Sequence, residues 1–198
     1  MAKLESTFKN MFLSLSLICL AVAFLLAQVN KMTAKPIAEA KAMKLQLAIG
    51  EVVPEFDNDP VAEVFMIPDE TGDSLMVYPA TKGGELVGVA ISSSASGFAG
   101  DIQIMVGFDM DNKVVNYEVL QHAETPGLGS KMDEWFKDTE SEGKSILGKD
   151  MSIGPLAVRN DGGGIDAITA STITSRAFLN AVNRAFAAYN DNRDKLDN

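Results

Sequence analysis

Residues 101–121 read DIQIMVGFDMDNKVVNYEVLQ, and this stretch decides the fold. Two runs rich in β-branched and aromatic residues, 102–108 and 114–120, flank a short polar turn. Such runs on either side of a turn predict the two strands of a hairpin. Similar runs at 75–78 and 86–92 precede them, with no helical pattern between successive runs. The sequence therefore predicts an antiparallel meander rather than a parallel sheet built from strand–helix–strand units.

A long amphipathic helix is predicted near the C-terminus, over residues 173–189. Its apolar residues recur at spacings of three and four: Ile173, Ala177, Phe178, Ala181, Val182, Ala185, Phe186 and Tyr189. This spacing places them on one helical face, which a sheet can bury. A turn at 97–100 and a short helix at 131–136 complete the predicted elements. We therefore predict an α+β body with an antiparallel sheet and a long C-terminal helix.

An uncharged apolar run occupies residues 11–29 near the N-terminus. As a helix it would extend about 28 Å, close to the roughly 30 Å of a bilayer core. A cleaved signal peptide is the alternative, but its small-residue site at 21–23 lies inside the run, so that cleavage would leave an apolar new terminus. We therefore predict a single uncleaved transmembrane helix that contacts lipid through residues 11–29.

The chain is predicted to consist of four parts. An N-terminal segment (1–10) precedes the span (11–29), which is followed by a helical stalk (30–50) and one folded domain (51–198). The stalk is rich in helix formers and is predicted to end at Gly50.

Charge and composition exclude several classes of function. Four lysines against one glutamate give residues 1–35 a charge of +3. Because the whole chain has a formal net charge of −10, the remaining 163 residues carry a charge of −13. Such an acidic body does not suit nucleic-acid binding, which needs lysine and arginine. The single cysteine, Cys19, lies in the apolar run, and His122 is the only histidine. We therefore predict no metal site and no thiol nucleophile in the body. A Ser-His-Asp triad is possible on residue counts, but the sequence has no Gly-x-Ser-x-Gly motif, and no catalytic residue is predicted.

Five hydroxyl side chains crowd the predicted start of the last helix: Thr169, Ser171, Thr172, Thr174 and Ser175. Helix capping is one explanation, because Ser and Thr satisfy the free N–H groups of a first turn. One cap needs one hydroxyl, however, and the positive end of a helix dipole also favours a phosphate group. From the residues alone, both capping and anion binding remain open.

Three motifs together resemble one family. Residues 122–129 read HAETPGLG and resemble the H-x-E-T-P-G-L-G signature of the FMN-binding G subunit of the Rnf electron-transport complex. Residues 166–172 (DAITAST) are similar to that family's flavinylation motif, D-x-x-S/T-G-A-T/S. Residues 97–109 resemble its G-x-x-G-x-I…VGxD stretch. With the N-terminal span, the resemblance covers nearly the whole chain.

The resemblance implies a covalent FMN, attached through a phosphoester to a threonine that falls on Thr172. It also implies a flavin transferase that installs the cofactor from FAD with magnesium, and gives Asp166 and Thr169 a recognition or positioning role. Ala170 and Ser171 depart from the usual glycine and alanine of the motif. Ser171 therefore offers a second hydroxyl beside Thr172.

The loop at 124–129 is expected to lie against the flavin. Gly127 and Gly129 allow close backbone approach, and Leu128 can cover the ring with an apolar side chain. Glu124 is either an acid/base group or the anchor of the loop, and we favour the anchor. The predicted cofactor-binding residues are Thr172, Asp166, Thr169, Ser171, Glu124, Thr125, Gly127, Leu128 and Gly129.

By resemblance, the chain is a membrane-anchored electron carrier of an Rnf-type complex, which couples electron transfer between ferredoxin and NAD⁺ to ion translocation. It would act as a redox subunit of that translocase, not as a catalyst alone, with the other membrane subunits as partners. The expected location is the inner membrane, with the soluble domain facing the periplasm or outside. One alternative is the C subunit of the sodium-translocating NADH:quinone oxidoreductase, which carries a similar flavinylation motif. The other is an anchored acidic binding module without redox activity.

Overall fold

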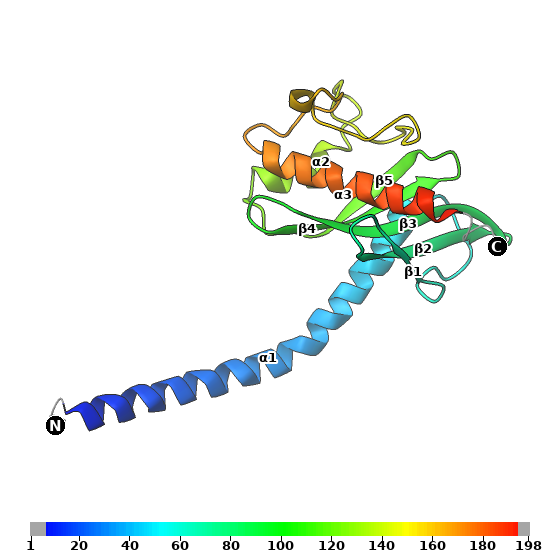
Figure 1. The fold of residues 1–198 in the computed structure, drawn as a ribbon. Helices are drawn as coiled ribbons and strands as arrows, with labels where there is room; N and C mark the ends of the chain where they lie inside the picture. Colours follow the sequence, from blue (N-terminus) through cyan, green and yellow to red (C-terminus); the bar gives the residue numbers. More distant parts are fainter. Residues whose placement is uncertain (1–6, 194–198) are drawn as a thin grey trace. The chain divides into compact units, whose positions relative to one another are not determined.

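The computed structural model describes residues 7–193, and the chain divides into two compact units, before and after the boundary between Met43 and Lys44. Helix α1 (Phe8–Val52) runs without interruption through the predicted span and the predicted stalk, with Pro36 inside it (Figure 1). It contains an apolar window of mean hydropathy 2.5 with no buried residue, and it is the one helix among the described residues that is long and apolar enough to cross a membrane.

Five antiparallel strands form one sheet in the order β1-β2-β3-β4-β5, which confirms the predicted meander. The strands are β1 (Phe65–Pro68), β2 (Ser74–Lys82), β3 (Glu85–Ser96), β4 (Asp101–Asp109) and β5 (Val114–Gln121). Strand β1 was not predicted. It has only four residues and ends in a proline, which breaks most strands but is tolerated at a sheet edge, so the segment is too short to stand out in the sequence.

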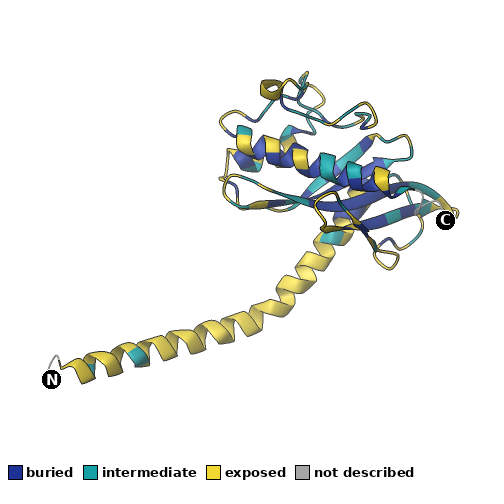
Figure 2. Ribbon diagram, in the orientation of Figure 1, coloured by how far each residue is buried: buried dark blue, intermediate teal, exposed yellow. Residues whose placement is uncertain are grey.

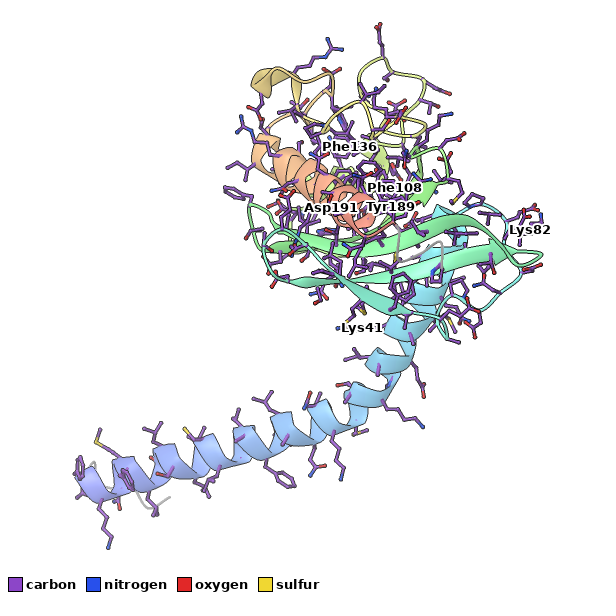
Figure 3. The ribbon with its side chains drawn as sticks, turned by 45° about the vertical axis from the view of Figure 1, so that its right-hand side comes forward. Lys41, Lys82, Phe108, Phe136, Tyr189 and Asp191 are labelled. Carbon is purple, nitrogen blue, oxygen red and sulfur yellow. The ribbon has the colours of Figure 1, made fainter. Side chains whose placement is uncertain are left out.

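Helix α3 (Thr172–Asp191) lies across one face of the sheet and buries its apolar side there (Figures 1 and 2). It begins one residue before, and ends two residues after, the predicted helix. Aromatic rings fill the layer between helix and sheet: Phe108 stacks on Tyr189 with centroids 6.1 Å apart, and Phe136 stacks on Phe178 at 4.5 Å (Figure 3). The predicted amphipathic helix is therefore confirmed as the main cover of the sheet.

Three short helices connect β5 to α3. They are η1 (Gly129–Lys131), α2 (Met132–Trp135) and η2 (Arg159–Asp161), of which α2 matches the short helix predicted at 131–136. The connection also returns to the sheet, because the amide of Val114 donates to the carbonyl of Lys149 and the amide of Gly148 donates to that of Val114.

The last turns of α1 pack on the opposite face of the sheet. Ala48, Ile49 and Val52 are buried there against Tyr78, Ala80, Ala90 and Met105. A Cβ at position 107 would collide with the carbonyl of Val52, so Gly107 allows this close approach. Because this contact buries residues on both sides of Gly50, the helix continues to Val52, and the predicted end at Gly50 is wrong by two residues.

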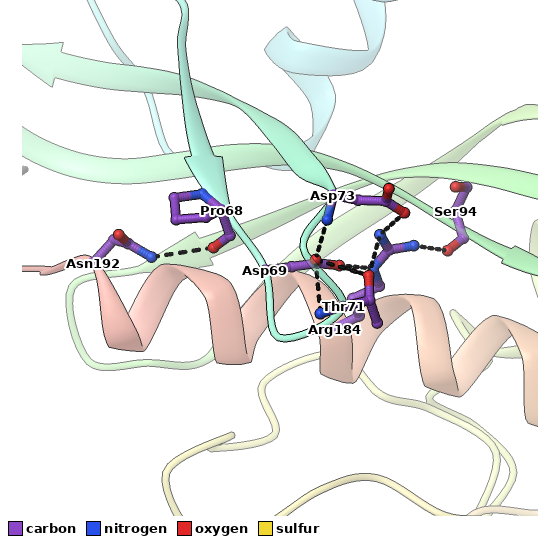
Figure 4. A network of polar contacts seen from close by, with 7 residues as sticks. All are labelled: Pro68, Asp69, Thr71, Asp73, Ser94, Arg184 and Asn192. Atoms are coloured by element: carbon purple, nitrogen blue, oxygen red, sulfur yellow. Dashed lines mark hydrogen bonds and ion pairs between the residues drawn. The ribbon is translucent and has the colours of Figure 1, made fainter.

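Arg184 of α3 ties the turn between β1 and β2 to the helix (Figure 4). Its guanidinium pairs with Asp69, whose side chain is 1% exposed, and with Asp73 at 2.8 Å, and it donates to the carbonyl of Ser94 at 3.0 Å. Burial acts to raise the pKa of Asp69, but hydrogen bonds from Thr71 and Arg184 outweigh it and lower that pKa below its usual value. The network therefore holds an ionised carboxylate against α3.

Replacing Arg184 tests this network. Arg184→Met should lower the free energy of unfolding by about 2 kcal/mol, because it leaves the covered carboxylate of Asp69 without its counter-charge. Denaturant unfolding of the detergent-solubilised full chain measures the effect. Arg176→Met is the matched control on the same helix, since the ion pair of Arg176 with Asp161 is half exposed and should contribute almost nothing. Equal losses in the two variants would contradict the assignment.

Candidate functional site

A pocket of about 330 Å³ lies where three segments distant in the sequence meet. The turn between β3 and β4 contributes Phe98, and the loop after β5 contributes Glu124, Thr125, Leu128 and Gly129. The start of α3 contributes the rest: Ala170, Ser171, Thr172, Ile173 and Thr174. Its volume falls at the lower end of the roughly 300–1,000 Å³ typical of small-molecule sites. All three motifs that carried the family resemblance therefore converge on one pocket.

The carboxylate of Glu124 joins the three segments. It is 5% exposed and accepts hydrogen bonds from the amides of Phe98 and Ala99 at 2.8 and 3.0 Å. Its other oxygen accepts from the hydroxyl of Thr174 at 2.7 Å. Burial acts to raise the pKa of Glu124, but these hydrogen bonds and the nearby His122 outweigh it and lower the pKa. Glu124 is thus an ionised structural anchor, as the favoured interpretation of its role expected.

Two glycines of the motifs make room for this carboxylate. A Cβ at Gly97 would collide with Oε1 of Glu124, and one at Gly129 would lie 2.5 Å from Oε2 and 2.8 Å from Oγ1 of Thr174. Neither glycine has a positive φ, so steric room rather than backbone conformation explains both. Gly127, in contrast, adopts a left-handed φ of 76° in open space, which glycine adopts at low cost.

The five hydroxyls at the start of α3 have different roles. Thr174 is buried and donates to Glu124, while Ser175 is buried, donates to the carbonyl of Ser171 and accepts from the amide of Ile168. Thr169 is exposed and does not line the pocket. Ser171 is 8% exposed, whereas Thr172 is half-buried and lines the pocket. Among the described residues, the side chain of Thr172 makes no hydrogen bond, so its hydroxyl is accessible and unoccupied by the protein.

The first turn of α3 has no side-chain cap among the described residues. Ser171 occupies the N-cap position without a hydrogen bond from its side chain to the helix. Residues of the first turn of this 20-residue helix line the pocket, and no side chain caps their N–H groups, which lie at the positive end of the helix dipole. This arrangement suits a phosphate group, and the residues present fit the FMN phosphate that the resemblance implied.

Three of the predicted site residues do not line the pocket: Thr169, described above, and Asp166 and Gly127. Asp166 forms an ion pair with Arg159 at 2.6 Å, and its backbone carbonyl accepts from the indole of Trp135. Gly127 lies at the turn beside the pocket but does not line it. Asp166 thus lies in the connection before α3, where it contacts Arg159 and Trp135.

Four pocket residues are absent from the predicted cofactor-binding set: Phe98, Ala170, Ile173 and Thr174. Phe98 lies inside the G-x-x-G stretch, but its own position in that pattern is variable, so the pattern gave no reason to select it. Ile173 was assigned to the buried face of the last helix, yet it is 50% exposed at the pocket. The available signal was its position: Ile173 directly follows Thr172 in the first turn of the helix, where a bound phosphate was expected.

Two larger hollows, of about 460 and 480 Å³, both border Arg184. The guanidinium of Arg184 is already engaged by Asp69, Asp73 and Ser94. The three motifs that form the smaller pocket contribute no residue to the first of these cavities. They contribute only Asp101 and Gln103 of β4 to the second. The pocket at Thr172 is nevertheless the stronger candidate, because the chemistry of its lining residues, rather than its volume, points to it.

The comparisons with known proteins agree with this choice. Residues 97–187, which include the whole pocket, match the model of the FMN-binding domain family. The chain is 34% identical to the G subunit of the ion-translocating oxidoreductase complex of Stutzerimonas stutzeri, over 87% of this chain and 77% of that protein. It is 35% identical to the same subunit of Yersinia pestis, over 90% of this chain and 88% of that protein.

The chain belongs to the family of G subunits of ion-translocating oxidoreductase complexes. The resemblance drawn from the three motifs is thereby confirmed, as is the presence of an FMN-binding domain. A crystal structure of the C subunit of the Na⁺-translocating NADH-quinone reductase from Parabacteroides distasonis is similar at 21% identity and a TM-score of 0.47, covering 69% of each chain.

One departure of this chain from the flavinylation motif has a structural cost. Ala170 replaces the usual glycine and adopts a left-handed φ of 60°, which is unfavourable for a residue with a Cβ. Ala170→Gly should therefore raise the free energy of unfolding by about 1 kcal/mol. Ala187→Gly, inside α3, should lower it by about 1 kcal/mol, because glycine is a poor helix former. Denaturant unfolding of both variants checks the opposite signs, and a loss of stability in Ala170→Gly would contradict the strain.

The hydrogen bonds to Glu124 predict a pH dependence. Because the folded pKa is lowered, the stabilisation is present above the unfolded pKa of about 4.3 and is lost as the pH falls through the folded value. Glu124→Gln should lower the free energy of unfolding by about 2 kcal/mol at pH 7, and the difference from wild type should shrink in acid. Unfolding curves between neutral and acid pH measure it. The exposed Glu85 provides the control Glu85→Gln, for which no such pH-dependent difference is expected.

Proposed function

We propose that this chain is a membrane-anchored electron carrier that holds FMN through a phosphoester on Thr172 within an ion-translocating oxidoreductase complex. One observation carries the proposal: of the five clustered hydroxyls, those of Ser171 and Thr172 line the pocket without a protein hydrogen bond among the described residues, and Thr172 is the more exposed of the two. Ser171 also lines the pocket, but its deeper burial favours its neighbour as the attachment point.

The phosphate is proposed to lie at the start of α3. The uncapped N–H groups of the first turn would donate to its oxygens, and the helix dipole would stabilise its negative charge. Since the described pocket wall has no lysine or arginine, the helix end supplies the favourable electrostatics. Glu124 does not compete for this role, because its carboxylate is already held by Phe98, Ala99 and Thr174.

Attachment requires a partner enzyme, and a flavin transferase acting on FAD fits the chemistry. The bond formed joins Oγ1 of Thr172 to the phosphorus of the FMN half, and the pyrophosphate bond of FAD breaks. The hydroxyl proton is released and AMP leaves. In this step the chain presents the hydroxyl and neutralises the phosphate, while the transferase and magnesium supply the activation.

FMN, when bound, supplies the one- and two-electron chemistry of a carrier. The residues of this chain hold and orient it: Leu128 and the backbone at Gly129 exclude water from one side of the pocket, and Glu124 keeps the loop in place. No side chain of the pocket needs to act on a substrate. The chain would therefore serve the translocase as a redox subunit and not as a catalyst alone.

The proposed setting is the inner membrane. Residues 11–29 of α1 would span the lipid, with the FMN domain on the periplasmic or outer side and the other membrane subunits as partners. In that position the chain would relay electrons between the subunits of a complex that couples the ferredoxin–NAD⁺ reaction to ion transport. The name of its relatives, which are G subunits of an ion-translocating oxidoreductase complex, supports this setting.

The attachment site is tested by peptide mass analysis. Full-length chain co-expressed with a flavin transferase should carry an FMN-sized mass increment on the peptide containing Thr172, and Thr172→Ala should lose both the increment and in-gel flavin fluorescence. Thr172→Ser should retain them, because it keeps a hydroxyl at the same place. Ser171→Ala and Thr169→Ala are the matched controls and should stay flavinylated. Full retention of flavin in Thr172→Ala would reject the assignment.

A further inference from the structure

Three exposed apolar side chains surround the pocket, each from a different segment. They are Phe98 on the β3–β4 turn, Leu128 on the loop after β5 and Ile173 on the first turn of α3. Phe98 is the most exposed of them at 71%. An aromatic ring left in water is unfavourable, and apolar groups converging on one pocket indicate an apolar ligand surface.

The backbone around Phe98 is held in place, so the side chain is presented by a fixed turn. The amides of Phe98 and Ala99 both donate to Glu124, and the amide of Gly97 donates to the carbonyl of Gly100 at 2.9 Å. Glu124 also holds Thr174, two residues from Thr172 in the sequence. One carboxylate therefore fixes the turn that carries Phe98 relative to the helix start that carries the attachment hydroxyl.

The polar and apolar parts of the pocket match the two halves of FMN. The phosphate needs the helix start, where the free N–H groups lie. The isoalloxazine ring is planar and aromatic, and it needs an apolar surface within reach of that phosphate. The charged group in the pocket wall, Glu124, is buried and engaged, which leaves the apolar rim to contact the ring.

We propose that Phe98 is a flavin-contact residue, whose side chain covers the isoalloxazine ring of an FMN held at Thr172. This inference rests on the proposed function and extends it to a residue outside the attachment and loop motifs. Phe98 positions and shields the ring, and takes no part in forming the phosphoester. A membrane surface or a partner protein as the occupant of this apolar rim is distinguished by the test below.

The test uses full-length chain co-expressed with the flavin transferase, and compares Phe98→Ala with Phe98→Tyr. Phe98→Ala should keep the flavin mass increment, while the visible circular dichroism of the flavin falls and the rate constant for iodide quenching rises about threefold, because the ring becomes more mobile and open to water. Phe98→Tyr should retain the wild-type dichroism. Met66→Ala is the matched control, since Met66 is 70% exposed on β1 but lies outside the pocket.

Each other outcome has a defined meaning. Flavinylated Phe98→Ala with unchanged dichroism and quenching would overturn the proposed contact with the flavin ring. If that variant instead lost only its association with membranes or with other subunits, the contact would also be overturned, and the apolar rim would be assigned to that partner. A folded Phe98→Ala without flavin would also overturn it, because Phe98 would then act in attachment. Wild-type chain without any flavin would reject the proposed function together with this inference, whereas the first two outcomes would leave the proposed function standing.

Discussion

The buried carboxylate of Glu124 is the interaction on which the candidate site depends. It joins the β3–β4 turn to the start of α3, which are more than seventy residues apart in the sequence, through the amides of Phe98 and Ala99 and the hydroxyl of Thr174. Hydrogen bonds to an ionised acceptor are stronger than neutral ones, and a carboxylate buried without them would be costly. The bonded carboxylate of Glu124 therefore helps to hold the three walls of the pocket in their relative positions.

This constraint explains residues that have no direct contact with a ligand. Gly97 and Gly129 are small because the carboxylate occupies the space where their Cβ atoms would lie. Thr174 uses its hydroxyl to hold Glu124, and Ser175 uses its hydroxyl within the backbone of the preceding turn. The hydroxyl of Thr172 is left accessible at the end of an uncapped helix. Neighbouring side chains of the same chemical type thus divide into those engaged within the protein and one, Thr172, that we propose for cofactor attachment.

The sheet fixes the position of the site, because the turn that connects β3 and β4 carries Phe98. Strands β3 and β4 meet at the turn of Phe98, and α3 crosses the same sheet with its first turn beside that turn. At the other end of α3, Arg184 binds the carboxylates of Asp69 and Asp73 and so fixes the helix on the sheet. The aromatic layer of Phe108, Phe178 and Tyr189 fills the space between these two polar anchors. The helix start can therefore serve as a rigid phosphate site.

The sequence by itself determined the family and the secondary-structure elements apart from β1 and the short 3₁₀ turns. The β-branched and aromatic residues of 102–108 and 114–120, the helical spacing from Ile173 to Tyr189 and the apolar run at 11–29 are local patterns, which can be recognised without knowledge of the fold. It also identified the motifs, because their order along the chain is a sequence property. Only the tertiary structure decided that Glu124 is an anchor, that Thr174 and Ser175 are engaged while Thr172 is accessible, and that Phe98 faces the pocket. Those facts depend on contacts between segments far apart in the chain, and no periodicity or spacing encodes which hydroxyl a distant carboxylate will bind.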